Sequence, residues 1–143
     1  MAVSPRLLLA YRRSRYTVGD VDVRIGRACP AMDGFLARHN ARSAVFVTAW
    51  NPRSRRMPEG WNARMQRRLA KRLRRVAYVS ADGSGRGWHE EHVLVFRPLP
   101  WVTGLAALFR QHAVVAVRRG RPARLVILPR HAGVAASEDT VPQ

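Results

Sequence analysis

The residues best suited to chemistry in this sequence are one carboxyl group and several amides, spaced widely along the chain. Glu90 offers a carboxyl that can act as a general base or anchor a ligand, and the amides offer hydrogen bonds to the same ligand. Catalysis would also need a nucleophile or a metal, and the sequence contains no motif for either. We therefore predict a candidate pocket formed by Thr48, Asn51, Asn62, Glu90 and Gln111.

The periodicity around two of these side chains predicts that they point inward. At 100° per residue Asn62 falls inside the apolar arc of its segment, between Leu69 and Leu73. In an extended segment Glu90 lies on the same side as His92 and the apolar residues that follow at even spacing. In a sheet such groups can converge at one end, where ligand-binding groups are commonly found.

A structural role for the same residues is the alternative. Asn51 stands between a β-branched, aromatic run and Pro52, where an Asn side chain can cap the transition into a loop. Asn62, Glu90 and Gln111 can satisfy buried backbone groups instead of a ligand. The sequence leaves both interpretations open.

The second candidate site is a strongly basic segment. Between Arg53 and Arg75 there are ten basic residues and one acidic residue, Glu59. Like charges three or four residues apart on a helix cost roughly 0.2–0.5 kcal/mol per pair, so a surface shaped for stability alone would include more acids. Arginine suits bidentate contact with phosphate. The alternative is a solvated face in a protein from an arginine-rich proteome.

We therefore expect the main function to be sequence-tolerant binding of nucleic acid, either RNA or a ribonucleoprotein, through phosphate contacts. A small-ligand binder or enzyme that uses the polar pocket is the second hypothesis. The predicted nucleic-acid-binding residues are Arg53, Arg55, Arg56, Arg64, Arg67, Arg68, Lys71, Arg74 and Arg75, with Arg119, Arg121 and Arg124 as auxiliaries.

Composition narrows the class of protein. The 143 residues carry a formal net charge of +17, which favours polyanionic partners. Cys29 is the only cysteine, so an intrachain disulfide is excluded and a reducing cytoplasm is expected. The apolar run near the N-terminus is too short for a signal peptide, and no run is long enough to span a bilayer. We expect no membrane partner.

Neither a metal nor a cofactor is predicted. His89 and His92 are three residues apart at an expected strand start, whereas the helical zinc motif has two His four apart. Residues 83–87 are glycine-rich but lack the lysine and the strand-to-helix context of a phosphate-binding loop. We interpret residues 81–87 as a flexible hairpin connection.

The elements that must position these residues follow from propensity and periodicity. We predict helices that begin at Ser4-Pro5, at Pro30, at residue 59 and after Pro98, and a buried central strand over residues 43–50. Further strands are expected within residues 16–25, 78–80, 92–96, 113–117 and 125–128, and the helix from residue 59 should reach residue 76. Residues 1–129 are predicted to form one domain, followed by a disordered tail over residues 130–143.

The order of elements from the central strand onward is β-α-β-β-α-β. This order predicts an α+β fold of the ferredoxin-like, split βαβ type. An extra C-terminal strand and an N-terminal helix and strand extension would be added to it.

Four short motifs occur in order along the chain: Thr48-Ala-Trp-Asn-Pro52, Asn62, Trp88-His-Glu-Glu91 and Gln111-His-Ala113. With these motifs the chain, from its Leu-rich start to about residue 128, resembles an uncharacterised bacterial family catalogued as domain of unknown function 3293. The family pattern has a strand ending in Thr-Ala-Trp-Asn-Pro, an Asn early in the next helix, Trp-x-Glu-Glu-Ser and Gly-Gln-Asn-Ala. This chain departs from it at His92, Arg110 and His112, where the pattern has Ser, Gly and Asn. The resemblance implies a shared fold and candidate site, and no established activity.

Overall fold

A computed structural model describes residues 3–129, which form four α-helices, one 3-10 turn and a seven-stranded sheet. The predicted α+β class is confirmed, whereas the predicted tail lies outside the described residues. The elements are α1 (Pro5–Arg13), β1 (Arg15–Val18), β2 (Val21–Val23), α2 (Pro30–Arg38), β3 (Ser43–Val47), η1 (Pro52–Ser54), α3 (Glu59–Arg72), β4 (Tyr78–Gly85), β5 (Trp88–Val95), α4 (Leu99–Leu108), β6 (Ala113–Arg118) and β7 (Arg121–Ile127).

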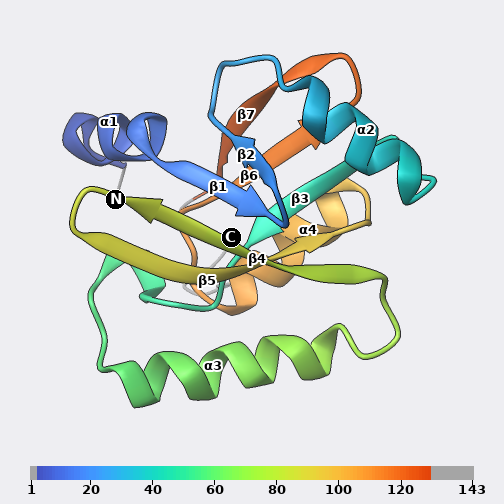
Figure 1. Cartoon of the computed structure of the whole chain (residues 1–143). Coiled ribbons are helices and arrows are strands. Elements are labelled where there is room, and N and C mark those ends of the chain that lie inside the picture. The colour runs from blue at the N-terminus through green and yellow to red at the C-terminus, as the bar shows by residue number, and fades with distance from the viewer. Residues whose placement is uncertain (1–2, 130–143) are drawn as a thin grey trace.

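The sheet has the order β2-β1-β4-β5-β3-β6-β7, and every pair of neighbouring strands is antiparallel. It is strongly curled (Figure 1). An isolated parallel bridge joins Ile25, which follows β2, to Ala123 in β7, so the two edges of the sheet meet. The backbone N–H of Gly26 donates to the carbonyl of Ala123 at 2.7 Å and strengthens this closure. The curl gives the sheet a concave inner face.

The inner face carries one of two hydrophobic cores. Tyr16 of β1 belongs to one buried cluster with Phe46 and Val115 of the neighbouring strands β3 and β6, although β1 lies three strands from β3 in the sheet order. Helix α2 adds Met32 and Leu36 to the same cluster. Burial of a side chain of this size contributes about 1.5–3 kcal/mol, so this core holds the curl together.

The outer face of β3 is covered by helices α3 and α4. Val45 and Val47 of the strand are buried with Leu69 of α3, with Leu73 at the C-terminal cap of α3 and with Val102 of α4. Because Phe46 belongs to the inner core, the prediction that both faces of the central strand are covered is confirmed. None of the helices within residues 3–129 is long and apolar enough to cross a bilayer.

The interpretation of residues 81–87 as a flexible loop is wrong. Strand β4 continues to Gly85 and pairs in register with β5, with Gly83 opposite Glu90 and Gly85 opposite Trp88, so only residues 86–87 form the hairpin turn. A Cβ atom at Gly83 would lie 2.5 Å from the His92 ring, and one at Gly85 would lie 2.3 Å from the Trp88 indole. The glycines are therefore in the strand because two aromatic rings of β5 lie across it, which no local propensity reveals.

Several predicted boundaries also differ from the structure. The strands predicted over residues 92–96 and 125–128 span Trp88–Val95 and Arg121–Ile127. The central strand ends at Val47 rather than at residue 50, because the chain turns away from the sheet before Asn51. Helix α3 ends at Arg72 rather than at residue 76, with the Leu73 N–H closing its last turn on the carbonyls of Leu69 and Ala70.

Candidate ligand-binding site

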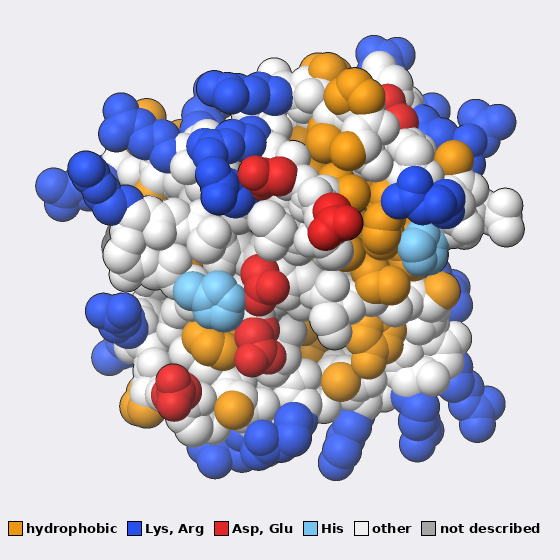
Figure 2. Space-filling view, viewed as in Figure 1, with side chains coloured by type: hydrophobic (Ala, Val, Ile, Leu, Met, Phe, Trp, Pro, Cys, Tyr) orange, Lys and Arg blue, Asp and Glu red, His pale blue; other side chains and the backbone are white. Residues whose placement is uncertain are grey.

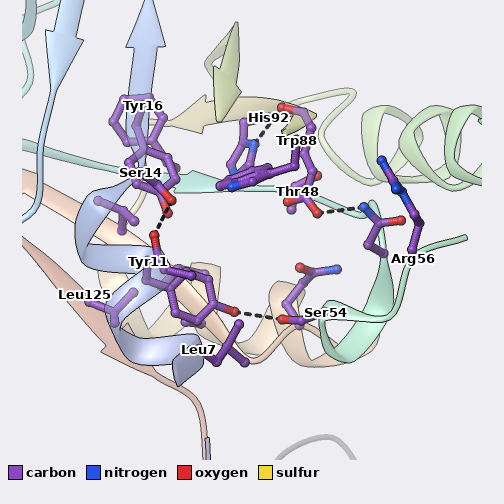
Figure 3. A pocket seen from close by; sticks show the side chains of 18 residues that line it. Leu7, Tyr11, Ser14, Tyr16, Thr48, Ser54, Arg56, Trp88, His92 and Leu125 are labelled. Carbon is purple, nitrogen blue, oxygen red and sulfur yellow. Dashed lines mark hydrogen bonds between the residues drawn. The ribbon is translucent and has the colours of Figure 1, made fainter. Parts of the chain in front are cut away.

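A cavity of about 250 Å³ opens on the inner face of the curled sheet, between α1 and strand β5 (Figure 3). Tyr11 of α1 reaches Ser54 on one side, and Trp88 and His92 of β5 lie on the opposite side. Four of the five predicted pocket residues line this cavity: Thr48, Asn51, Glu90 and Gln111. The fifth, Asn62, is buried behind Asn51.

Asn51 is the centre of the polar network at this cavity. Its side-chain Nδ2 donates to Glu90 Oε2 at 2.8 Å. Its Oδ1 accepts hydrogen bonds of 2.9 Å from Asn62 Nδ2 and from the backbone N–H of Met57. The backbone N–H of Asn51 donates to Asn62 Oδ1 at 2.9 Å, so the two asparagines hold each other by two bonds. Asn62 thus fixes Asn51, and Asn51 holds the Glu90 carboxyl group.

The loop that carries Asn51 has an unusual backbone. Asn51, Arg53 and Ser54 have φ values of 45°, 54° and 61°, in the left-handed region that non-glycine residues rarely adopt. Residues held in such conformations cost of order 1–3 kcal/mol each, and they persist only where surrounding contacts fix them. Here the Arg53 N–H donates to the Arg110 carbonyl at 2.7 Å, and the Ser54 hydroxyl lies 3.1 Å from the Tyr11 hydroxyl. The loop is therefore held in place from α1 and from the end of α4.

Glu90 is the ionisable group most directly affected by this site. Burial raises the pKa of its carboxyl above the ordinary value, and the Asn51 hydrogen bond and the nearby His89 act in the opposite direction. Its neighbour Glu91, one residue on and on the other side of the strand, is exposed. The Glu90 side chain therefore points inward, as predicted.

His92 forms the wall next to Glu90. Its Nδ1 is 3.1 Å from the backbone carbonyl of Glu90, and its ring meets Tyr16 edge to face at 5.6 Å. Burial lowers the pKa of His92 to about 4, so the imidazole is neutral at pH 7. His89, in contrast, is exposed and pairs with Asp82 at 2.9 Å. As expected from their odd spacing, the two histidines face opposite sides of β5.

Gln111 and Thr48 combine cavity lining with structural bonds. Gln111 Nε2 donates to the carbonyls of Trp50 at 3.0 Å and Phe109 at 3.2 Å. Thr48 Oγ1 donates to the carbonyl of Glu91 and accepts from the Trp50 N–H at 3.0 Å. Part of the alternative, structural interpretation therefore holds for these two residues and for Asn62, which donates to the Met57 carbonyl at 3.3 Å.

Sequence reasoning missed several residues of this cavity. Tyr16 and His92 could have been found from parity, because Tyr16 shares the inner face of its strand with Val18 and His92 shares that of β5 with Leu94. Tyr11 and Ser14 had no such signal, because nothing in the local pattern says where the N-terminal helix docks. Trp88, which the sequence offered only as part of the Trp88-His-Glu-Glu91 motif, also lines the cavity.

The structure places the predicted nucleic-acid-binding residues on the surface. All nine, from Arg53 in the loop to Arg75 beyond α3, have exposed side chains, as do the auxiliaries Arg119, Arg121 and Arg124. Within residues 3–129 the ion pairs are Arg15 with Asp22 and His89 with Asp82, so none involves this basic segment. Figure 2 shows basic side chains along the α3 edge, with acidic side chains spread over the strands above it, from the β1–β2 region to β4 and β5. Arg56 belongs to both sites, since it also lines the cavity.

Comparison with known proteins matches one family to this region of the chain. Curated proteins and solved structures give no match. The model of a family described as Protein of unknown function (DUF3293) matches residues 47–114, from the end of β3 to the start of β6. This segment contains Asn51, Asn62, Glu90 and Gln111, the residues that suggested the resemblance. The predicted resemblance to domain of unknown function 3293 is therefore confirmed over residues 47–114, just under half of the chain.

Proposed function

We propose that the protein binds a small ligand in the cavity between α1 and β5, with Glu90 as the anchor. The observation that carries the proposal is a partly buried carboxyl group held by Asn51 at 2.8 Å within a cavity of about 250 Å³. Burying a carboxyl group costs free energy unless it is paired. Among residues 3–129 no cationic side chain pairs with Glu90, and only one of its carboxyl oxygens accepts a hydrogen bond from the protein. A ligand donor at the second oxygen would supply the missing partner.

The geometry favours this function over a purely structural role. Asn62, Gln111 and Thr48 each satisfy backbone groups, whereas the Glu90 side chain makes no bond to the backbone of residues 3–129. Its contribution to the fold is one hydrogen bond, while its burial raises its pKa. Such an arrangement is typical of functional sites.

A thermal-shift screen of small amines, nucleosides and amino acids, followed by calorimetry of the hits, tests the proposal. The wild type and Glu90→Gln are compared, and Glu91→Gln serves as the matched control because Glu91 is exposed on the other side of the same strand. We expect Glu90→Gln to weaken binding about tenfold or more while the control leaves it unchanged. Equal affinity in all three proteins would refute Glu90 as the anchor.

We also propose a second function, the binding of nucleic acid in the cytoplasm through the basic segment of residues 53–75. Two observations support it: all ten basic side chains of this segment are exposed, and none is paired with an acid within residues 3–129. A row of unpaired arginines is suited to phosphate contact and gives binding that weakens with salt. RNA or a ribonucleoprotein remains the expected partner.

Fluorescence polarisation with a short labelled RNA and a matching DNA, across a salt series, tests this second proposal. Replacing Arg67, Arg68, Lys71 and Arg75 by Gln should remove most of the affinity and reduce the salt dependence. The control variant replaces four other exposed arginines, Arg12, Arg13, Arg27 and Arg86, and so removes the same charge. If both variants lose affinity equally, general charge rather than this face is responsible.

For the fold we propose a ferredoxin-like core. The strand order β4-β5-β3-β6 supports it, as do α3 between β3 and β4 and α4 between β5 and β6. Both helices pack on the same face of these strands. Strand β7 and the N-terminal elements extend the core at its two edges.

A further inference from the structure

We propose that the ligand of the cavity is a nucleobase, carried either by a free nucleotide or by a single-stranded polynucleotide. This inference rests on the proposed ligand site and adds the chemical class of its occupant. It follows from the hydrogen-bonding groups that the protein leaves uncommitted, the aromatic walls of the cavity and the cations at its rim.

Three of the polar residues that line the cavity, Gln111, His92 and Glu90, each leave an acceptor for a ligand. Because carbonyl oxygens only accept, Gln111 must turn its amide nitrogen to the two backbone carbonyls that it contacts, which leaves its Oε1 uncommitted. By the same reasoning His92 donates from Nδ1 to the carbonyl of Glu90, so Nε2 of the neutral ring keeps its lone pair. Glu90 itself has one oxygen held by Asn51 and one uncommitted. A compact ligand rich in N–H donors fits this set.

The apolar part of the cavity consists largely of aromatic rings. Tyr16, Phe46 and Trp88 line it, and Gly85 allows the Trp88 indole to lie against β4. Its volume, about 250 Å³, is just below the ~300–1,000 Å³ of pockets for drug-sized ligands. Unstacked bases are commonly held against aromatic side chains in this way. The space therefore suits one planar ring system.

The rim of the cavity carries positive charge. Arg56 lines the cavity with an exposed side chain, and Arg53 and Arg55 belong to the same loop. A phosphate at this rim would meet guanidinium groups, whereas inside the cavity it would meet the carboxyl of Glu90. These charges favour a ligand orientation in which the base points into the cavity and the phosphate points outward. The outward direction leads toward the exposed arginines of α3.

The acceptor set also predicts which base is preferred. Adenine and cytosine carry an exocyclic amino group that can donate to Glu90. Uracil presents carbonyl oxygens in the corresponding region, and these would face acceptors of the protein. A buried site with unpaired polar groups rejects the wrong analogue strongly.

Calorimetric titration of the full chain with adenosine, cytidine and uridine tests the inference. We expect adenosine or cytidine to bind about tenfold or more tightly than uridine. Glu90→Gln, which adds an amide donor, should reduce this ratio to within about threefold, while Glu91→Gln should leave it unchanged. The preference of the wild type stands as a test by itself if Glu90→Gln does not fold.

Equal binding of the three nucleosides would overturn the inference, and so would a preference that Glu90→Gln leaves intact. Binding of spermidine or agmatine, dependent on Glu90 and without any nucleoside binding, would also overturn it while the proposed ligand site survives. If no compound of the panel binds, both proposals fail.

Adenosine monophosphate and a short oligoadenylate distinguish the two sources of the base. A free nucleotide as ligand predicts that the monophosphate binds as tightly as the oligomer. A polynucleotide predicts tighter binding of the oligomer, weakened by Glu90→Gln by the same factor as adenosine. In both cases Arg56→Gln should weaken the monophosphate but not the nucleoside, and equal loss for both would refute the assigned phosphate position.

Discussion

At the scale of single residues, the site contains two ionisable groups, Glu90 and His92, whose charged forms are disfavoured by burial. Burial raises the pKa of Glu90 and lowers that of His92, so the protein disfavours the charged form of each. The two pKa shifts change the free energy of unfolding with pH in opposite directions. Glu90 becomes charged by losing a proton, whereas His92 becomes charged by gaining one. This difference allows them to be measured separately.

His92 is expected to make the fold less stable in acid. Its pKa is about 4 in the folded state and about 6.5 in the unfolded chain, so between these values the unfolded chain binds more protons. The free energy of unfolding should therefore fall as the pH drops from about 6.5 to about 4, by up to about 3 kcal/mol. Urea unfolding across this range measures it. In His92→Phe, which keeps a ring over Gly83, this fall should disappear, and an unchanged pH dependence would contradict the assignment.

Glu90 is expected to act in the other direction. Its pKa is raised in the folded state, so above the unfolded value the folded protein holds the proton longer. The contribution to stability is therefore present in acid and lost as the pH rises through the folded pKa. Wild type should lose stability relative to Glu90→Gln as the pH increases from about 4 to 7.

Asn51→Ala should raise the Glu90 pKa further, because it removes the hydrogen bond that favours the carboxylate. Carbon-13 NMR of the Glu side chains follows this pKa, and a downward shift would be inconsistent with the bond.

Residue periodicity could predict part of this site and not the rest. The helical projection placed Asn62 inward and strand parity placed Glu90 inward, because each property follows from local geometry. The Tyr11 contact with Ser54 joins residues 43 positions apart, and no periodicity encodes such a contact. The left-handed conformations of Arg53 and Ser54 were equally hidden, because neither residue type favours them.

At the scale of elements, the β4–β5 hairpin is the part that sequence patterns described worst. The Gly-Ser-Gly segment has low strand propensity, and the structure uses its missing side chains to admit the rings of His92 and Trp88. The register of the hairpin, with Gly83 opposite Glu90, therefore places the glycines and the site residues together. The helix starts at Pro5 and Pro30, in contrast, were predicted correctly because proline at the first helical turn is a local signal.

Gly83→Ala tests this relation between β4 and the site. The added methyl group would have to displace the His92 ring, because the Cβ atom would lie 2.5 Å from it, and we expect destabilisation of about 1–3 kcal/mol. Gly104→Ala is the control, because a Cβ there meets nothing within 4 Å and α4 should gain about 0.5–1 kcal/mol. Chemical denaturation gives both values. Equal stability of Gly83→Ala and wild type would show that His92 does not need the glycine.

At the scale of the whole molecule, the curl of the sheet decides where the cavity lies. The closure depends on Ile25 and Ala123, which are nearly 100 residues apart, and α1 lines the cavity on the inner face. Sequence reasoning found the order of the elements but not this closure, because pairing between the sheet edges is a long-range property. The second global feature, the net charge of +17, was readable from composition alone.

That charge predicts a salt effect on stability. The basic residues of α3 and its flanking segments repel one another and have no acidic partners within residues 3–129, so screening should stabilise the fold. We expect the melting temperature to rise by a few degrees between low and moderate sodium chloride, where about 1 kcal/mol corresponds to roughly 2–8 °C for domains of this size range. Differential scanning calorimetry measures this. The rise should be smaller in the variant with Arg67, Arg68, Lys71 and Arg75 replaced by Gln, and an equal rise would place the repulsion elsewhere.

The most direct test of the proposed ligand site is a nitrogen-15 NMR titration of the protein with the small-molecule panel. It follows the indole N–H of Trp88, the side-chain amides of Asn51 and Gln111, and the backbone amides of α3. A ligand held by Glu90 in the cavity predicts that the Trp88, Asn51 and Gln111 signals shift together and saturate at one affinity. Shifts confined to α3, or no shift at these three side chains for any compound, would contradict the account.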